Sequence, residues 1–176
     1  MQTDKPLRLF FALSCPSDLA DAICNWRDSH ALGGRPVAQA NLHMTLAFLG
    51  NQPATAVDGL KQLANSLRVD AFLLQLDQLQ MIGKNFACLT PSLSPSPLID
   101  LVGQLHAGLS AHGVVLDSRP FLPHVTLSRQ VHALPTMEPR AFRWAVNHFG
   151  LYLSENTAQG AHYTELASWP LAAPCG

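Results

Sequence analysis

The sequence predicts an α+β fold built by internal duplication, with two pseudo-symmetric lobes. The first observation is a repeated tetrapeptide, His-apolar-Thr-apolar, at residues 43–46 and again at residues 124–127. The second is that a predicted strand and a predicted helix precede each copy in the same order. The third is the composition, 48% hydrophobic and 13% charged over 176 residues, which is sufficient for a buried core. We therefore expect one domain, residues 1–176, made of two interleaved lobes with one motif in each.

The first half reads as strand, helix, motif strand and helix. Residues 7–13 are apolar and bulky enough for a buried strand, and apolar side chains at helical spacing then predict a helix through Trp26. The glycine-rich residues 33–36 predict a loop. The first motif lies in a predicted strand, residues 42–49, and a helix over residues 57–67 follows, with apolar side chains on one face.

The second half repeats this order with additional strands. Gly83-Lys84-Asn85 predicts a turn, residues 91–97 form a Ser/Pro loop, and a helix begins near Leu98 with apolar side chains at 98, 102, 105 and 109. The last two strands of this half are expected to form an antiparallel pair. The predicted strands are residues 71–82, 86–89, 121–131, 141–153 and 161–169.

The chemistry of the repeated motif follows from the geometry of a strand. Side chains of a strand alternate between its two faces, so His43 and Thr45 share one face, as do His124 and Thr126. Imidazole gives and takes protons near neutral pH, and a threonine hydroxyl donates to a phosphate oxygen. Two such strands facing one cleft would be suited to opening a phosphodiester without a metal.

The charge balance limits the partners. Eleven basic residues against twelve acidic ones give a net charge of −1, which argues against a long groove that follows many phosphates. It permits a compact site for one or two phosphates, and most of the cations are Arg, which binds phosphate through a planar fork.

The location of the protein is expected to be the cytoplasm. The four cysteines have no CxxC or metal-type spacing, which favours reduced thiols: Cys15, Cys24, Cys88 and Cys175. The apolar run at residues 9–13 is shorter than the roughly 7–15 residues of a signal-peptide core, and Pro16 follows soon after it. Nothing approaches the ~20 apolar residues of a membrane span, so no membrane association is predicted.

Residues 41–50, Asn-Leu-His-Met-Thr-Leu-Ala-Phe-Leu-Gly, and residues 123–129, Pro-His-Val-Thr-Leu-Ser-Arg, resemble the 2H phosphoesterase superfamily. Within it the chain is most similar to the bacterial RNA 2′,3′-cyclic phosphodiesterases, long called 2′-5′ RNA ligases. The resemblance implies antiparallel sheets lining a central cleft, helices packed outside, and hydrolysis of a 2′,3′-cyclic phosphate to a 2′-phosphomonoester. It also implies a phosphate contact by Arg129.

That reaction requires one proton donor and one proton acceptor on opposite sides of the phosphorus. We assign His43 as the general acid to the departing O3′ and His124 as the general base to water. Thr45 and Thr126 would hold the non-bridging oxygens, whose charge grows in the transition state. A 5′-hydroxyl in place of water would give reversible 2′-5′ joining without ATP. No cofactor and no metal is expected, because the sequence has no phosphate-binding loop, HExxH motif or carboxylate cluster.

Several alternatives stay open. The substrate is expected to be RNA with a 2′,3′-cyclic phosphate end or a 2′-5′ linkage, tRNA fragments included, acted on by a monomer. One other interpretation is a phosphodiesterase that acts on a small cyclic nucleotide or on ADP-ribose 1″,2″-cyclic phosphate. Another is a non-catalytic nucleotide- or RNA-binding module. Phe48 either packs in the core or stacks on a base. The cations and aromatics of residues 140–144 either contact RNA or form a solvated face beside buried rings.

Overall fold

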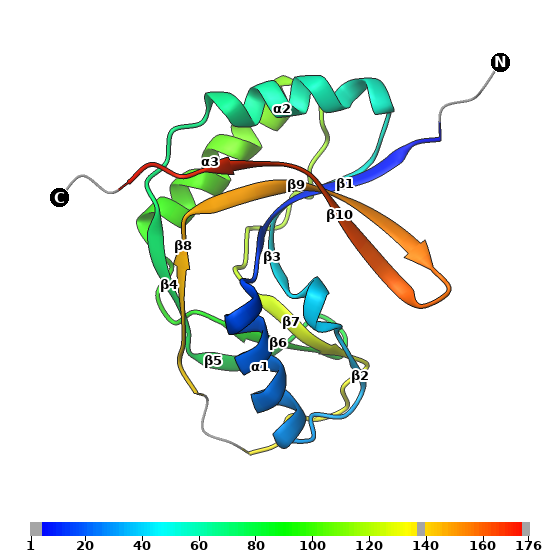
Figure 1. Ribbon diagram of the computed structural model, residues 1–176, viewed down its shortest axis with the longest axis vertical. Coiled ribbons are helices and arrows are strands. Elements are labelled where there is room, and N and C mark those ends of the chain that lie inside the picture. The colour runs from blue at the N-terminus through cyan, green and yellow to red at the C-terminus, as the bar shows by residue number, and fades with distance from the viewer. Residues whose placement is uncertain (1–4, 137–139, 174–176) are drawn as a thin grey trace.

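The computed structural model describes residues 5–136 and 140–173 of the chain (Figure 1). Three α-helices and two short 3-10 helices lie within these residues: α1 Ser17–Ser29, η1 Gln39–Asn41, η2 Ala54–Ala56, α2 Val57–Ser66 and α3 Ser96–Ala111. The strands of the first half are β1 Leu7–Ser14, β2 Arg35–Pro36, β3 His43–Gln52, β4 Phe72–Leu76 and β5 Gln78–Ile82. Those of the second half are β6 Phe86–Thr90, β7 Val125–Arg129, β8 Phe142–Val146, β9 His148–Thr157 and β10 Gly160–Pro170.

The strands form two four-stranded sheets, in the orders β10-β9-β1-β3 and β2-β7-β6-β5, and a two-stranded sheet of β4 and β8. All of the pairs between these strands are antiparallel. In each large sheet the motif strand pairs with the strand that precedes it in the repeat, β3 with β1 and β7 with β6. The predicted α+β class with antiparallel sheets is confirmed, and the pairing has the two-lobed pattern that the duplication predicts.

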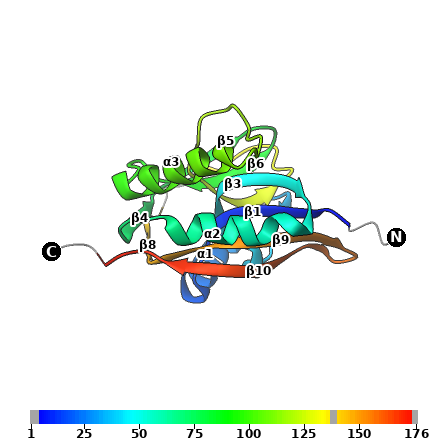
Figure 2. The same cartoon turned by 90° about the horizontal axis from the view of Figure 1, so that it is seen from above.

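The helices lie toward the two ends of the molecule. Helix α1 is at one end, and α2 and α3 pack on each other at the other (Figures 1 and 2). The apolar stripe predicted for α3 is buried at Leu98, Val102, Leu105 and Leu109. One continuous apolar cluster contains side chains of both large sheets and all three helices, so the two lobes share a core. This core fixes the two motif strands relative to each other.

Two strands that the sequence predicted as single elements are each divided. Residues 71–82 form β4 and β5, which separate at Asp77, and residues 141–153 fall in β8 and β9, which separate at Asn147. The two halves of each segment belong to different sheets. The carboxylate of Asp77 accepts hydrogen bonds from the backbone N–H and the hydroxyl of Ser92, at 2.7 and 2.5 Å, which holds the chain at the break. A one-residue break leaves too little trace in the apolar pattern to be predicted.

Other boundaries also differ from the prediction. Residues 33–36 were expected to form only a loop, but Arg35–Pro36 is strand β2, which pairs with Arg129 and Ser128 of β7. The second motif strand begins at Val125 and not at residue 121, and therefore His124 lies immediately before it. Helix α1 continues to Ser29, and α3 begins at Ser96, inside the segment predicted as a Ser/Pro loop.

The cations of residues 140–144 lie beside buried rings. Phe142 and Trp144 are buried, whereas Arg140 and Arg143 are exposed, which is the arrangement of a solvated face. Cys15, Cys24 and Cys88 are free thiols, and Cys175 lies outside the described residues. In the part of the chain that the structure describes, no helix has the length and apolar character to cross a membrane.

Candidate functional site

The two motifs meet at one cavity. Strands β3 and β7 belong to different sheets but contact each other. The apolar residues of the motifs are buried in the core: Met44 and Leu46 on β3, and Val125 and Leu127 on β7. The histidine and the threonine of each motif are half-buried. The polar side chains line a cavity of about 260 Å³. This cavity brings together all six residues singled out from the sequence: His43, Thr45, Phe48, His124, Thr126 and Arg129.

Both imidazoles are held in the same way. Nδ1 of His43 lies 2.7 Å from the carbonyl oxygen of Asn41, and Nδ1 of His124 lies 2.7 Å from that of Leu122. A carbonyl oxygen only accepts hydrogen bonds, so each Nδ1 carries a proton and donates it. Each neutral ring therefore has its free lone pair on Nε2. In His43 this atom is 3.0 Å from the hydroxyl of Thr45. The backbone two residues earlier in the chain thus fixes which ring nitrogen keeps its lone pair.

A β-bulge at the equivalent place in each motif sets the rest of the site. On β3, Ala12 is opposite Thr45 and Phe11 is opposite Ala47, so Leu46 is an extra residue. On β7 the same shift between neighbouring pairs makes Leu127 the extra residue. An extra residue changes the phase of the alternation and re-aims the side chains that follow. This is why Phe48 and Arg129, equivalent positions of the two motifs, face the cavity.

The bulges explain two differences from a regular strand. Regular alternation would place Arg129 on the apolar face, whereas its side chain is exposed and lines the cavity. The interpretation of Phe48 as a core residue is wrong, since its side chain is 47% exposed. The guanidinium of Arg8 lies 4.9 Å from the centre of the Phe48 ring, a cation–π distance. The Phe48 ring and the cation beside it thus both line the cavity.

The charges around His43 favour its neutral form. Burial is the main cause that lowers the pKa of His43 below its ordinary value of 6.5, and the Asn41 carbonyl partly offsets it. The nearby imidazole of His124 and the guanidinium of Arg129 lower this pKa further. The rings of Phe10 and Tyr163 each lie 5.2 Å from the His43 ring and shield it from water. Among the described residues, no carboxylate lines this cavity. Its basic side chains are Arg8, Arg129 and the two imidazoles.

Sequence reasoning missed several residues of this cavity. Phe10 is on β1 opposite Phe48, and the pairing of β1 with the motif strand is the signal that could have found it. Tyr163 comes from the distant β9–β10 hairpin, and no local pattern connects it with the motifs. Asn41 lies next to the motif and donates from its side-chain amide to the carbonyl of Ala161, which attaches that hairpin to the site at 2.9 Å.

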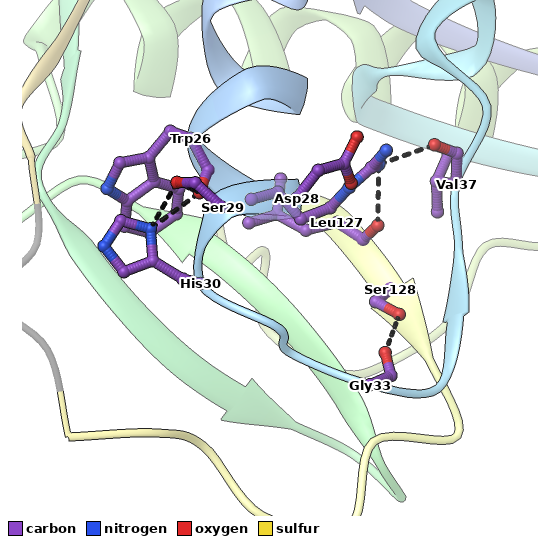
Figure 3. Close-up of polar contacts among 9 residues, drawn as sticks. Trp26, Asp28, Ser29, His30, Gly33, Val37, Leu127 and Ser128 are labelled. Atoms are coloured by element: carbon purple, nitrogen blue, oxygen red, sulfur yellow. Dashed lines mark hydrogen bonds and ion pairs between the residues drawn. The ribbon is translucent and has the colours of Figure 1, made fainter.

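A buried arginine supports the second motif through backbone carbonyls. Arg27 is 7% exposed, and its Nη1 donates to the carbonyls of Val37, at 2.7 Å, and Leu127, at 3.2 Å. The hydroxyl of Ser128 donates to the carbonyl of Gly33 at 2.8 Å. Figure 3 shows these contacts joining the segment before η1 to strand β7. Within residues 5–136 and 140–173 no group of three His, Cys, Asp or Glu side chains is placed to hold a metal ion.

Comparison with known proteins gives consistent results. Residues 15–158 match the model of the 2′-5′ RNA ligase superfamily. The chain is 38% identical over 172 residues to the RNA 2′,3′-cyclic phosphodiesterase of Escherichia coli (strain K12), with 95% of this chain and 98% of that protein covered. The protein of the same name from Thermus thermophilus is 29% identical over 182 residues, covering 94% and 90%.

The crystal structure of E. coli LigT complexed with 3′-AMP has a TM-score of 0.88 against this structure at 37% identity, over 94% of this chain and 98% of that one. The sequence match extends over most of the chain, the fold agrees, and both motifs line one cavity. The chain belongs to the 2′-5′ RNA ligase superfamily, as its two motifs predicted.

Proposed function

We propose that this chain hydrolyses the 2′,3′-cyclic phosphate at the end of an RNA to a 2′-phosphomonoester, without a metal. The observation that carries the proposal is the pair of imidazoles, each with Nδ1 bonded to a backbone carbonyl, on one cavity with two threonines. The relatives named RNA 2′,3′-cyclic phosphodiesterase, and the LigT structure with a bound nucleotide, support this substrate class.

Different solvent access to the two histidines supports the division of their roles. His43 is enclosed by Phe10 and Tyr163, whereas the hydrogen bond between His124 and Leu122 is exposed to solvent. The nucleophile of a hydrolysis is water, which has the easier access to the half-buried imidazole whose hydrogen bond is exposed to solvent. His124 is therefore the base that deprotonates water, and His43 is the acid that protonates O3′ as the P–O3′ bond breaks. The negative phosphate offsets the positive charges around His43 and favours its protonated form when substrate binds.

The phosphate is held by groups from both lobes. The hydroxyls of Thr45 and Thr126 donate to the two non-bridging oxygens, one from each motif, and Arg129 supplies the positive charge. Phe48, exposed beside Arg8, is the candidate for stacking on the terminal base. The same in-line geometry with a 5′-hydroxyl as nucleophile gives 2′-5′ joining and its reversal.

The organisation that accompanies this function is a single domain acting as a cytoplasmic monomer on RNA ends. The shared apolar core of the two lobes supports the single domain, because separating the lobes would expose it. Each lobe supplies one histidine and one threonine, so neither lobe alone has the full set of groups.

The test is product analysis on an RNA that ends in a 2′,3′-cyclic phosphate, with EDTA present, for the unmodified protein, His43→Ala and His124→Ala. We expect a 2′-phosphate from the unmodified protein and a loss of about 10²–10⁴-fold in kcat for each variant. Full turnover by either variant would refute the two-histidine mechanism. Loss of turnover on addition of EDTA would show that a metal takes part. Binding without turnover in the unmodified protein would favour the non-catalytic interpretation.

A further inference from the structure

A second cavity adjoins the motif cavity. It has a volume of about 620 Å³ and shares the lining residues Val37, Asn41, Arg129 and Tyr163 with the first. We call it the flanking cavity. Its charged lining residues, Arg35, Lys84 and Arg129, are all basic. In a chain of net charge −1 this local excess of positive charge indicates an anionic ligand.

Two of these cations are placed against each other. Arg35 of β2 and Arg129 of β7 are opposite residues in the antiparallel pair, a position at which like charges destabilise a sheet. Neither forms a salt bridge with any residue that the structure describes. Bound phosphates beside these guanidinium groups would offset the repulsion between them.

The fold holds Arg35 in this position through the segment before it. A Cβ added to Gly34 would lie 2.2 Å from the carbonyl oxygen of Arg129, so the two backbones approach as closely as glycine permits. Arg27 and Ser128 attach the same segment to β7 through Val37 and Gly33. Arg35 is therefore positioned by buried contacts although its own side chain is exposed.

The rest of the lining suits a nucleotide better than a free phosphate. Phe86 presents a 38% exposed ring to the flanking cavity, and aromatic rings stack on bases of any sequence. Asn85 and Gln130 line it as well, with positive φ values of 71° and 56°. Non-glycine residues in this conformation cost energy and concentrate at binding sites. Their side-chain amides supply donors and acceptors for base edges or ribose.

We propose that the flanking cavity binds the nucleotide that precedes the terminal one in the RNA chain. Arg35 and Lys84 contact the phosphodiester that links these two nucleotides, and Phe86 stacks on the penultimate base. The inference rests on the proposed function, because the terminal cyclic phosphate must occupy the motif cavity. It predicts a preference for substrates of at least two nucleotides, since a mononucleotide 2′,3′-cyclic phosphate lacks the linking phosphodiester that Arg35 and Lys84 contact.

The experiment compares kcat/KM for a short single-stranded RNA ending in a 2′,3′-cyclic phosphate with kcat/KM for the mononucleotide 2′,3′-cyclic phosphate. The ratio of the two is measured for the unmodified protein, Arg35→Ala and Lys84→Ala. Arg143→Ala is the matched control, because Arg143 is an exposed cation on β8 that lines neither cavity. We expect the ratio to fall roughly five- to tenfold in Arg35→Ala and Lys84→Ala and to stay unchanged in Arg143→Ala.

Salt dependence provides a second readout that a merely structural effect would not change. The slope of log kcat/KM against log salt concentration for the RNA should become shallower by about 0.7 for each phosphate contact removed. An unchanged ratio in Arg35→Ala and Lys84→Ala, or an equal fall in Arg143→Ala, would overturn the inference. Turnover of the RNA substrate would still preserve the proposed function. Failure of the unmodified protein to hydrolyse either substrate would overturn both.

Discussion

Replacing Arg27 by Met tests how the second motif strand is supported. Met keeps the apolar volume of the buried side chain and removes its donors. The carbonyl of Leu127 would still accept the backbone N–H of Val37 at 2.9 Å. The carbonyl of Val37 would lose its 2.7 Å bond from Arg27, the shorter of the two. The substitution thus leaves one carbonyl of the support without the donor that it has in the native protein.

The magnitude follows from these contacts. A hydrogen bond to a charged group contributes about 1.5–3 kcal/mol, and the longer bond to Leu127 is taken at the lower end of that range. The ion pair with Asp28 contributes about 0–1 kcal/mol, because the Asp28 side chain is 62% exposed. We expect Arg27→Met to lower the free energy of unfolding by about 2–4 kcal/mol. Asp28→Asn, the matched control, should lower it by less than about 1 kcal/mol.

Urea unfolding measures both variants, and kcat/KM on an RNA with a cyclic phosphate end measures the functional consequence. Arg27→Met should lower kcat/KM even in the folded protein, because the segment that carries Arg35 and Val37 loses its attachment to β7. Equal destabilisation by Arg27→Met and Asp28→Asn would refute the reasoning, since it would assign the stability to the exposed ion pair. A loss below about 1 kcal/mol in Arg27→Met would refute it as well.

The other predictions concern glycine and histidine. Gly34→Ala should lower the free energy of unfolding by more than about 2 kcal/mol, because the new Cβ meets a backbone oxygen. Gly33 has a similar φ and open space around it, so Gly33→Ala should lower it by only about 1–2 kcal/mol. Equal losses in urea unfolding would contradict this. Arg129→Gln should raise the pKa of His43 in the free protein, since a nearby positive charge is removed, and an unchanged NMR titration would count against the described geometry. Folding lowers the pKa of His43, so below about pH 6.5 the unfolded chain takes up a proton that the native protein does not. The native protein should therefore lose stability as the pH falls below about 6.5. The His43→Gln variant should lose less stability over the same range.

The chemistry of this protein was visible in its sequence because a strand has a short period. Alternation alone placed His43 and Thr45 together and sent Met44 to the core, and the structure shows that arrangement. The repeat of strand, helix and motif predicted two equivalent lobes, and in each of them the motif strand pairs with the strand that precedes it in the repeat. The stripe on α3 was equally local, since its spacing follows from the turn of a helix.

Only the tertiary structure decided which further side chains join the motifs. The bulges at Leu46 and Leu127 are defined by pairing with another strand, so the faces of Phe48 and Arg129 could not be read from their own segments. Tyr163 lines both cavities from a hairpin far from either motif in sequence, and Arg35 lies opposite Arg129 only because β2 pairs with the distant second motif strand. The two His-x-Thr pairs could be predicted from sequence because their pattern is local. The surroundings of these side chains and the shapes of the two cavities depend on contacts between distant segments, and so they required the structure.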